Sequence, residues 1–437
     1  EAGMVKPVLS WGRAQRYDQT VVSLGRFETF FDGNRSVEGP VTFRGMGRSY
    51  GDVALNENGT LVQAAGPDSV IAFDRDTGIL RARSGLTLAD LHRITIPTGW
   101  IVAVTPGTKF VTLGGSVAND VHGKNHHMAG SFGAHVTALM LVRSNGERLL
   151  CSPTENADMF ALTISGLGLT GYIEWVELQL KRITSSEMYV ENLPYADLDE
   201  FFLLNQQSAD WPYTVAWIDC FSPEALLGRG IFSRARFADS GPLEARPADK
   251  AIKWPLEMPS FLLNPMSISA FNWLYRHRPA ATFKGEQDYD PFFYPLDGIL
   301  DWNKLYGHKG FFQHQSIIPM ENGKAGVREL LEAIRREGQG SFLAVLKVHG
   351  KELSPGLNTF PYEGVSLALD FANRGRKTVD FLHRLDAIVL AHGGRMYPAK
   401  DALMTGETYR KTYPNWEALE NARDPMISSS FWRRVTN

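Results

Sequence analysis

Two adjacent glycines in a short run of residues constrain this chain more than any other feature. The segment Val111 to His127 reads VTLGGSVANDVHGKNHH, with Gly114 and Gly115 near its start and a polar, histidine-rich end. Glycine has no Cβ to hold a ligand away, and Thr112 can cap a helix whose first amides and positive dipole end favour an anion. The sequence therefore predicts a short helix after Thr112 that can receive an anionic cofactor such as a pyrophosphate.

A second glycine cluster, FRGMGRSYGD, comes directly after the apolar stretch Val41 to Phe43. Its three glycines allow close backbone approach, and Arg44 and Arg48 add positive charge. The spacing matches neither the dinucleotide fingerprint nor the phosphate-binding P-loop, and a plain tight turn accounts for such a cluster equally well. The pattern predicts a strand followed by a loop.

Taken together, the two clusters resemble the flavin domain of the vanillyl-alcohol oxidase superfamily, in which two such segments enclose the pyrophosphate of FAD. Within it, HGKNHH at 122–127 and AGSFG at 129–133 resemble the decaprenylphosphoryl-β-D-ribose oxidase family. The resemblance continues in Trp302-Asn303, in QHQ at 313–315 and in GRMYPAKD at 394–401, so it spans most of the chain. It implies an α+β, two-domain PCMH-type FAD-binding fold with a β-sheet-based substrate domain.

Length and composition agree with two domains. The chain has 437 residues, of which 43% are hydrophobic, and a formal net charge of -3. We expect an FAD-binding domain at 1–183, a substrate domain at 184–395 and a C-terminal segment, 396–437, that returns to the first domain. The charge argues against a nucleic-acid partner. Since no apolar run is long enough to span a bilayer, we expect a cytoplasmic or peripherally membrane-associated protein, and a periplasmic one stays open.

Local patterns predict the main elements. We expect strands near 60–64, 79–83, 136–142, 172–180 and 342–349, a capped helix at 86–93, and helices around 327–334 and 382–389 that end at glycines. Cys151 and Cys220 are expected to be ordinary buried thiols rather than a disulfide or metal site. Residues 242–290 are rich in Pro, basic and aromatic residues with poor periodicity, which suits either a mobile lid or simple disorder.

The resemblance implies a set of FAD contacts from both glycine clusters and from later segments. They are Arg44, Gly45, Met46, Gly47, Arg48, Ser49, Tyr50, Gly51, Gly107, Thr112, Gly114, Gly115, Asn119, Asp120, His122, Gly123, Ile173 and Tyr397. Relatives in the superfamily often attach flavin covalently through a histidine near His122, whereas the more similar epimerase-type oxidases do not. We therefore expect noncovalent FAD.

Oxidation of a secondary alcohol needs a hydride acceptor and a group that takes the hydroxyl proton or stabilises the alkoxide. Lys400 is the first candidate, because a lysine in a dry pocket can have a lowered pKa and act as a proton acceptor or as a charge. The matching lysine of the family's Tyr-x-Ala-Lys motif lies at the flavin, which supports this role. His122 is a second catalytic candidate, although a histidine in such a loop is more often a hydrogen-bonding residue.

A set of polar and aromatic residues is a candidate for holding the sugar and phosphate, with ordinary lining of a domain interface as the alternative. They are Lys124, Trp217, Gln313, Gln315, Lys347 and Lys400. Spacing of four would let His122 and His126 share a metal, but Gly123 and the lack of nearby carboxylates argue against it, so no metal is expected.

The resemblance implies FAD-dependent oxidation of the C2 hydroxyl of a polyprenyl-phosphoryl-β-D-ribose to the 2-keto sugar. This is the first half of an epimerisation to the arabinose donor of cell-envelope arabinan. An NADH-dependent short-chain reductase would act on the product, and a quinone or other acceptor would reoxidise the flavin. An alditol or aldonolactone oxidase of the same superfamily and a non-catalytic flavin-binding partner protein are the alternatives. Ala368, Ser366 and Val215 replace a Cys, an Asn and a Ser of mycobacterial members, so specificity and inhibitor sensitivity are left open.

Overall fold

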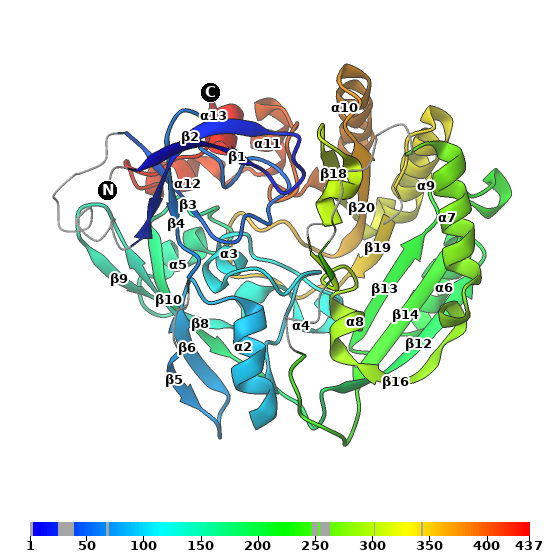
Figure 1. The fold of residues 1–437 in the computed structure, drawn as a ribbon, viewed down its shortest axis with the longest axis horizontal. Coiled ribbons are helices and arrows are strands. Elements are labelled where there is room, and N and C mark those ends of the chain that lie inside the picture. The colour runs from blue at the N-terminus through cyan, green and yellow to red at the C-terminus, as the bar shows by residue number, and fades with distance from the viewer. Residues whose placement is uncertain are drawn as a thin grey trace.

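The computed structural model describes residues 3–24, 39–66, 70–246, 252–253, 263–300, 302–341 and 344–437. Within them the chain has the expected α+β fold, with sheets and helices mixed along its length (Figure 1). In spatial order, a four-stranded sheet contains β1 (Met4–Leu9), β2 (Arg16–Ser23), β4 (Thr60–Gln63) and β3 (Val41–Arg44). A five-stranded sheet contains β5 (Val70–Asp74), β6 (Ile79–Arg83), β10 (Tyr172–Gln179), β8 (Val136–Val142) and β9 (Arg148–Cys151).

An eight-stranded sheet forms the other half of the molecule. In order it contains β16 (Lys284–Asp288), β12 (Glu187–Tyr195), β14 (Gly230–Phe237), β13 (Tyr213–Ile218), β19 (Ala344–His349), β20 (Gly364–Ala372), β18 (Phe311–Pro319) and β21 (Arg395–Met396). Short strands pair as β7 (Trp100–Ile101) with β11 (Lys181–Arg182) and as β15 (Ile252–Lys253) with β17 (Ile299–Leu300).

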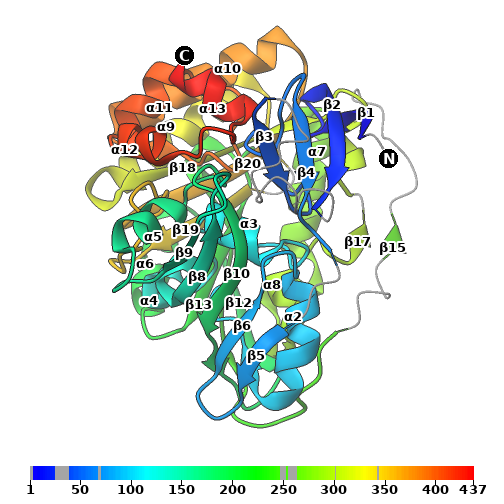
Figure 2. The same ribbon diagram turned by 90° about the vertical axis from the view of Figure 1, so that its left-hand side faces the viewer.

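The helices surround these sheets. They are α2 (Leu88–Thr95), α3 (Leu113–Ala118), α4 (His126–Ala129), α5 (Ala157–Thr163), α6 (Leu198–Gln207), α7 (Pro265–His277), α8 (Tyr289–Phe293), α9 (Met320–Glu337), α10 (Arg376–Ala391), α11 (Gly406–Thr412), α12 (Trp416–Ala422) and α13 (Ser430–Thr436). In both views α3 lies near the centre of the molecule, beside the five-stranded sheet (Figures 1 and 2). No helix in the described ranges is long and apolar enough to cross a membrane.

Local sequence explains the helices that were predicted. Thr87 and Asp90 form a reciprocal capping box at the start of α2, and α9 ends at Gly338, whose φ of 72° favours glycine. The apolar residues of α9 and α10 are buried against one face of the eight-stranded sheet. The predicted strands at 60–64, 79–83, 136–142 and 172–180 are confirmed, and β19 confirms the strand from Ala344, with 342–343 outside the described residues. Both cysteines are buried free thiols, as expected.

The segment 242–290 differs from the expectation of an irregular region. Residues 265–277 form α7, capped by Asn264 with Pro265 in its first turn, and 284–288 form the edge strand β16, which pairs with β12. The helix escaped the periodicity analysis because its apolar residues lie on its outer face as well as on its inner one. Residues 247–251 and 254–262 of the predicted lid lie outside the described residues, and a lid stays a prediction.

The end of the chain lies against its beginning. The amide of Val41 donates to the carbonyl of Met426 at 2.8 Å, and the amide of Ser428 donates back to Val41 at 3.1 Å. The C-terminal helices gather beside β1–β4 (Figure 1). This arrangement brings residues from both ends of the chain next to the glycine loop.

Candidate active site

The two glycine segments of the sequence meet in the structure. Thr112 caps α3, since its hydroxyl accepts from the amide of Gly115 at 3.0 Å, as predicted. The loop after β3 packs directly on this cap, because a Cβ added to Gly45 would lie 2.6 Å from the Thr112 hydroxyl. A side chain at residue 45 would therefore separate the loop from the helix.

The same loop also touches the Tyr-x-Ala-Lys segment. The amide of Tyr50 donates to the carbonyl of Ala399 at 3.1 Å. A Cβ on Gly51 would meet the carbonyl oxygen of Asp401 at 1.6 Å, a distance that backbone atoms cannot accommodate. This close approach places the ammonium nitrogen of Lys400 4.0 Å from the ring centroid of Tyr50.

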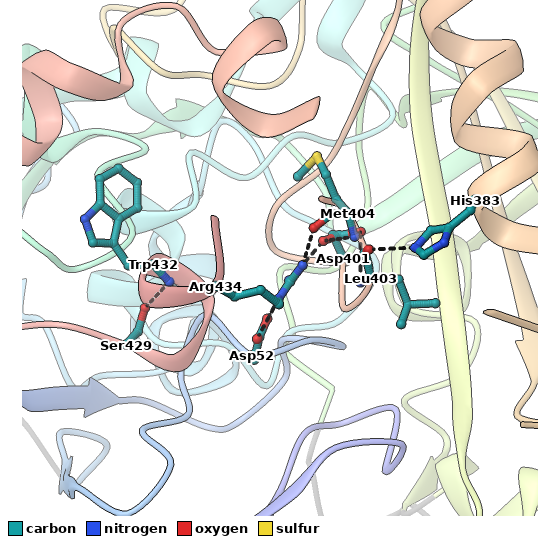
Figure 3. Close-up of polar contacts among 8 residues, drawn as sticks. All are labelled: Asp52, His383, Asp401, Leu403, Met404, Ser429, Trp432 and Arg434. Carbon is teal, nitrogen blue, oxygen red and sulfur yellow. Dashed lines mark hydrogen bonds and ion pairs between the residues drawn. The ribbon is translucent and has the colours of Figure 1, made fainter. Parts of the chain in front are cut away.

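An ion cluster from the C-terminal helix joins these two segments (Figure 3). Arg434 on α13 makes a two-pronged contact with Asp52, at 3.0 and 2.9 Å, and a third hydrogen bond to Asp401 at 3.1 Å. Asp52 follows Gly51, and Asp401 follows Lys400, so one guanidinium binds both loops within a residue or two of Tyr50 and Lys400. The carboxylate of Asp401 also accepts from the amide of Met404, which closes the loop beyond it.

One face of the eight-stranded sheet carries the predicted substrate residues. Strand pairing aligns Trp217, Val345, Ala368 and Gln315 in one row, because each is the cross-strand partner of the next. Neighbouring rows pair Lys347 with Ser366 and Gln313 with Asp370. Side chains of residues two apart share a face, so all these residues lie on the side opposite the core of α9 and α10.

Four histidines come together at the edge of this face. The rings of His122 and His349 are 5.1 Å apart, and those of His126 and His349 are 4.6 Å apart. His127 accepts from Lys347 at 2.8 Å through Nδ1 and contacts the Trp211 carbonyl at 2.6 Å through Nε2. Burial lowers the pKa of His122 and His126 to about 3 and of His127 to about 4, with nearby cations adding to the shift.

Three further ionisable groups have shifted pKa values. Burial lowers the pKa of Lys400 to about 8, against an opposing effect of the Asp370 carboxylate. Burial raises the pKa of Asp370 to about 7, while its hydrogen bond from Gln313, at 2.8 Å, works in the other direction. The pKa of Lys347 falls well below its usual range, because it is buried and Lys124 lies nearby. Groups poised near neutral pH are typical of sites that move protons.

The remaining residues expected to contact FAD have varied surroundings. The guanidinium of Arg44 donates to the carbonyls of Ala54 and Leu9, and that of Arg48 lies 3.9 Å from the Trp11 ring centroid. Asp120 is fully buried and accepts from several protein donors, namely Ser131, Gly133, Ser354 and Thr359. The structure thus gives Arg44 and Asp120 a role in shaping the loops, and FAD contact by either stays a prediction.

The other residues expected to contact FAD lie near the two glycine segments or in the core of the sheets. Tyr397 stacks on Phe360 with ring centroids 4.6 Å apart, and its hydroxyl donates to the Asn119 carbonyl at 3.1 Å. Ile173 lies in the core of the five-stranded sheet. Gly107 faces open space, and Gly114 packs on Ser84. Met46 is exposed, whereas Gly47 and Gly123 pack closely on other protein atoms. The carbonyl of Ser49 accepts a hydrogen bond from the amide of Trp11.

The residues in this region leave polar atoms suited to a cofactor. Asn119 Oδ1 and His122 Nδ1 are buried and have no hydrogen-bond partner among the described residues. His122 Nε2 accepts from the Gln315 amide at 2.9 Å, and because an amide NH2 can only donate, the ring proton lies on Nδ1. Buried polar atoms are normally satisfied, so both fit a ligand with polar edges such as FAD. The described residues contain no group of histidines, cysteines and carboxylates arranged to hold a metal.

Sequence reasoning missed three residues that the structure places here. Asp370 interrupts the apolar run LALDFA, and a lone carboxylate in an otherwise apolar strand could have marked it as a candidate from the sequence. His349 ends β19 and bonds Ser366 at 2.8 Å through Nε2. Arg434 lies far from any motif, and nothing in the sequence marks it. The structure brings Gln313, Gln315, Lys347 and Lys400 to one region. Lys124 lies near Lys347 and donates to the Phe293 carbonyl at 3.0 Å.

Comparison with known proteins decides the family. Residues 34–152 match the FAD binding domain model. The chain is 31% identical over 455 aligned positions, 98% of this chain and 97% of the relative, to decaprenylphosphoryl-β-D-ribose oxidase from Mycolicibacterium smegmatis. The chain belongs to the decaprenylphosphoryl-β-D-ribose oxidase family. It is therefore an FAD-dependent oxidoreductase that acts on CH–OH groups, with the α+β PCMH-type fold that its sequence predicted.

Other relatives match as well. An uncharacterized protein in the mprA 5′ region of Streptomyces coelicolor is 30% identical over 80% of this chain and its own whole length. L-gulonolactone oxidase from Mus musculus is 30% identical over 31% of this chain and 30% of its own. Likeness to the Mycolicibacterium smegmatis oxidase thus covers nearly the whole chain, including the eight-stranded sheet, whereas likeness to the lactone oxidase covers less than a third of it.

Proposed function

We propose that this enzyme oxidises the C2 hydroxyl of a polyprenyl-phosphoryl-β-D-ribose to the 2-keto sugar. The observation that carries the proposal is the position of Lys400, whose ammonium lies over the Tyr50 ring and near enough to Asp370, on the sheet face, to interact with its carboxylate. The similarity of nearly the whole chain to decaprenylphosphoryl-β-D-ribose oxidase supports the substrate class. A small soluble sugar would leave the cations beside this face without a phosphate to bind.

Lys400 is proposed as the base. With a pKa near 8, a useful fraction of the side chain is neutral at physiological pH and can take the hydroxyl proton. FAD, when bound, supplies the acceptor for the hydride that leaves the sugar carbon. The 4.0 Å contact with Tyr50 fixes where the amine lies, and the close packing of Gly51 on Asp401 keeps its loop in place.

The sugar and phosphate are proposed to lie along the sheet face. Lys347 already donates to Thr214 and His127, each at 2.8 Å, and a substrate phosphate beside this buried amine would favour its charged form and raise its lowered pKa. Gln313 and Gln315 offer amide groups to sugar hydroxyls, and Trp217 offers an apolar surface. Ala368, Ser366 and Val215 belong to the same face, so the departures from mycobacterial members change the surface that the substrate meets.

FAD is proposed to bind noncovalently. His122 is held neutral by burial, and its Nε2 is occupied by Gln315, so its Nδ1 proton is placed to donate a hydrogen bond. Precipitation of the protein with acid checks this proposal, since noncovalent FAD is released into the supernatant and covalent FAD stays in the pellet. A yellow pellet after washing would contradict it.

Epimerisation by way of a 2-keto product requires two partners, a reductase for the product and an electron acceptor for the flavin. A 2-keto sugar is converted to the arabinose epimer only by a reductase, for which we propose an NADH-dependent short-chain enzyme. A quinone or another acceptor must then reoxidise the flavin. Neither partner is needed for the first half-reaction, so that half-reaction can be tested with the purified protein alone.

Anaerobic flavin absorbance tests the proposal. Addition of a short-chain prenylphosphoryl ribose is expected to bleach the flavin, and free alditols and aldonolactones serve as controls. Bleaching by a free alditol or lactone, but not by the phosphoryl ribose, would support the alternative that the partial likeness to L-gulonolactone oxidase favours. That result would overturn the substrate assignment while leaving the flavin chemistry.

A further inference from the structure

The outer face of α7 is apolar. Met266 is 82% exposed, Leu274 62%, Trp273 53% and Phe271 39%. Single exposed apolar residues are ordinary, but four large ones on one helix form a contiguous apolar surface of the kind that marks an interaction site. The helix lies by the ends of β12 and β13, where Arg276 contacts Tyr195 and Tyr275 contacts Trp217, on the right-hand side of the molecule in Figure 1 and away from β5 and β6.

Helix geometry shows that this surface is the side turned away from the protein. Ile268 and Asn272, four residues apart, are the buried residues of α7, and Asn272 donates to Asp219 at 2.9 Å. At 100° per residue, Met266, Trp273 and Leu274 project from the opposite side. A surface helix of a water-soluble protein normally shows polar residues there, so α7 has the reverse of the usual pattern.

The charge of α7 restricts what could cover it. Its sequence, PMSISAFNWLYRH, contains no acidic residue and ends in Arg276 and His277, followed by Arg278. Arg276 donates to the Tyr195 carbonyl at 3.1 Å, so His277 and Arg278 are the exposed basic residues of this end. Arg278 lies over the Tyr275 ring, 3.6 Å from its centroid, and the Trp273 and His277 rings stack at 4.4 Å. An apolar face with tryptophan and a basic end is the composition of helices that lie in the interface of an anionic bilayer.

The helix also touches the substrate face. Tyr275, on α7, contacts Trp217 with ring centroids 4.6 Å apart. Trp217 begins the row that continues through Val345 and Ala368 to Gln315. A lipid surface held against α7 would therefore lie next to the end of the row that leads to Lys400.

We propose that α7 docks on the surface of an anionic lipid bilayer and holds the sheet face beside the membrane from which a lipid-linked substrate is taken. The purpose given to this docking rests on the proposed function, because it assumes a lipid-linked substrate, but the binding of α7 to the bilayer does not require the substrate. The apolar residues enter the interface, and the basic end meets the lipid phosphates.

Vesicle co-sedimentation without substrate tests the docking. The FAD-loaded full-length protein is mixed with phosphatidylglycerol-containing vesicles or with pure phosphatidylcholine vesicles. The test variant combines Met266→Ser, Trp273→Ser and Leu274→Ser. The matched control combines Leu353→Ser and Leu357→Ser, which replace residues that are 85% and 45% exposed outside α7. Thermal unfolding and flavin absorbance establish that both variants are folded.

The expected result is binding to anionic vesicles that weakens with salt, falls about ten-fold or more in the triple variant, and is unchanged in the control. No binding by the wild-type chain, or equal binding by the triple variant, would overturn the proposal. Equal binding to neutral vesicles would overturn the anionic surface as the partner. Self-association in sedimentation velocity that the triple variant abolishes, without vesicle binding, would assign the face to a second copy of this chain. Bleaching by the short-chain substrate in vesicle-free buffer reports on the proposed function separately.

Discussion

The ammonium of Lys400 lies 4.0 Å from the ring centroid of Tyr50, and the two residues come from opposite ends of the chain. No single motif creates this contact. It depends on the hydrogen bond from the Tyr50 amide to the Ala399 carbonyl, on the close approach that Gly51 allows because it has no side chain, and on the ion cluster around Arg434 (Figure 3). The chemistry proposed for the site depends on how firmly these contacts hold the amine.

Replacement of Lys400 by methionine is expected to slow flavin reduction by about 10²- to 10⁴-fold, because the substrate hydroxyl loses its proton acceptor. Methionine keeps much of the side-chain volume, so the flavin spectrum of the oxidised enzyme should be retained. Anaerobic stopped-flow absorbance measures the rate. Lys351→Met, at an exposed position, is the control, and a loss below about ten-fold in Lys400→Met would contradict the assigned role.

The pH dependence of flavin reduction should report on Lys400 and Asp370. A base must be neutral to act, so the rate is expected to rise with pH through an apparent pKa near 8. The Asp370 carboxylate favours the charged lysine and raises its pKa, so Asp370→Asn should move this limb to lower pH. The exposed Asp380→Asn should leave it in place. A rate that falls as pH rises would show instead that Lys400 acts as a positive charge.

Loss of the Arg434 guanidinium should destabilise the fold strongly. Arg434→Met leaves Asp52, 1% exposed, and Asp401, 9% exposed, without their cation, and removal of one partner of a buried pair costs about 3–5 kcal/mol in the free energy of unfolding. The exposed pair of Arg376 with Asp380 provides the comparison, where Arg376→Met should cost well under about 1 kcal/mol. Urea unfolding of both variants measures the two losses in the free energy of unfolding. Similar losses would show that the ion cluster around Arg434 does not stabilise the fold in this way.

The histidine cluster predicts acid sensitivity. Folding lowers the pKa of His122 and His126 to about 3, so the folded chain holds them neutral while the unfolded chain protonates them near pH 6.5. The stability that depends on neutral rings is thus present above about pH 6.5 and is lost as pH falls toward 3. His126→Asn should reduce the slope of unfolding free energy against pH by up to about 1.4 kcal/mol per unit between pH 6 and 4. The exposed His383→Asn should leave that slope unchanged, and an unchanged slope in His126→Asn would contradict the prediction.

Local patterns were enough for elements whose signals are local. The cap of α2, the Thr112 cap of α3 and the glycine end of α9 each lie within a few residues of the helix they define, and each was predicted, although the part of Asp90 in the α2 cap was not. The helix α7 was missed, because its exposed apolar face removes the periodicity on which prediction relies. The chemical types of the candidate site, among them Lys400 and Gln315, were also visible in the sequence.

The sequence by itself determined the flavin-type glycine segments, the α+β class and the family. Tertiary structure decided what those glycines contact: Gly45 accommodates the Thr112 cap and Gly51 the Asp401 carbonyl, so both allow protein segments to approach each other. It also decided that Asp370, His349 and Arg434 belong to the site region. Their partners are distant in the chain, so these contacts form only once the sheet and the C-terminal helix have packed. The shifted pKa values of Asp370 and His349 come from burial, which likewise exists only in the packed structure.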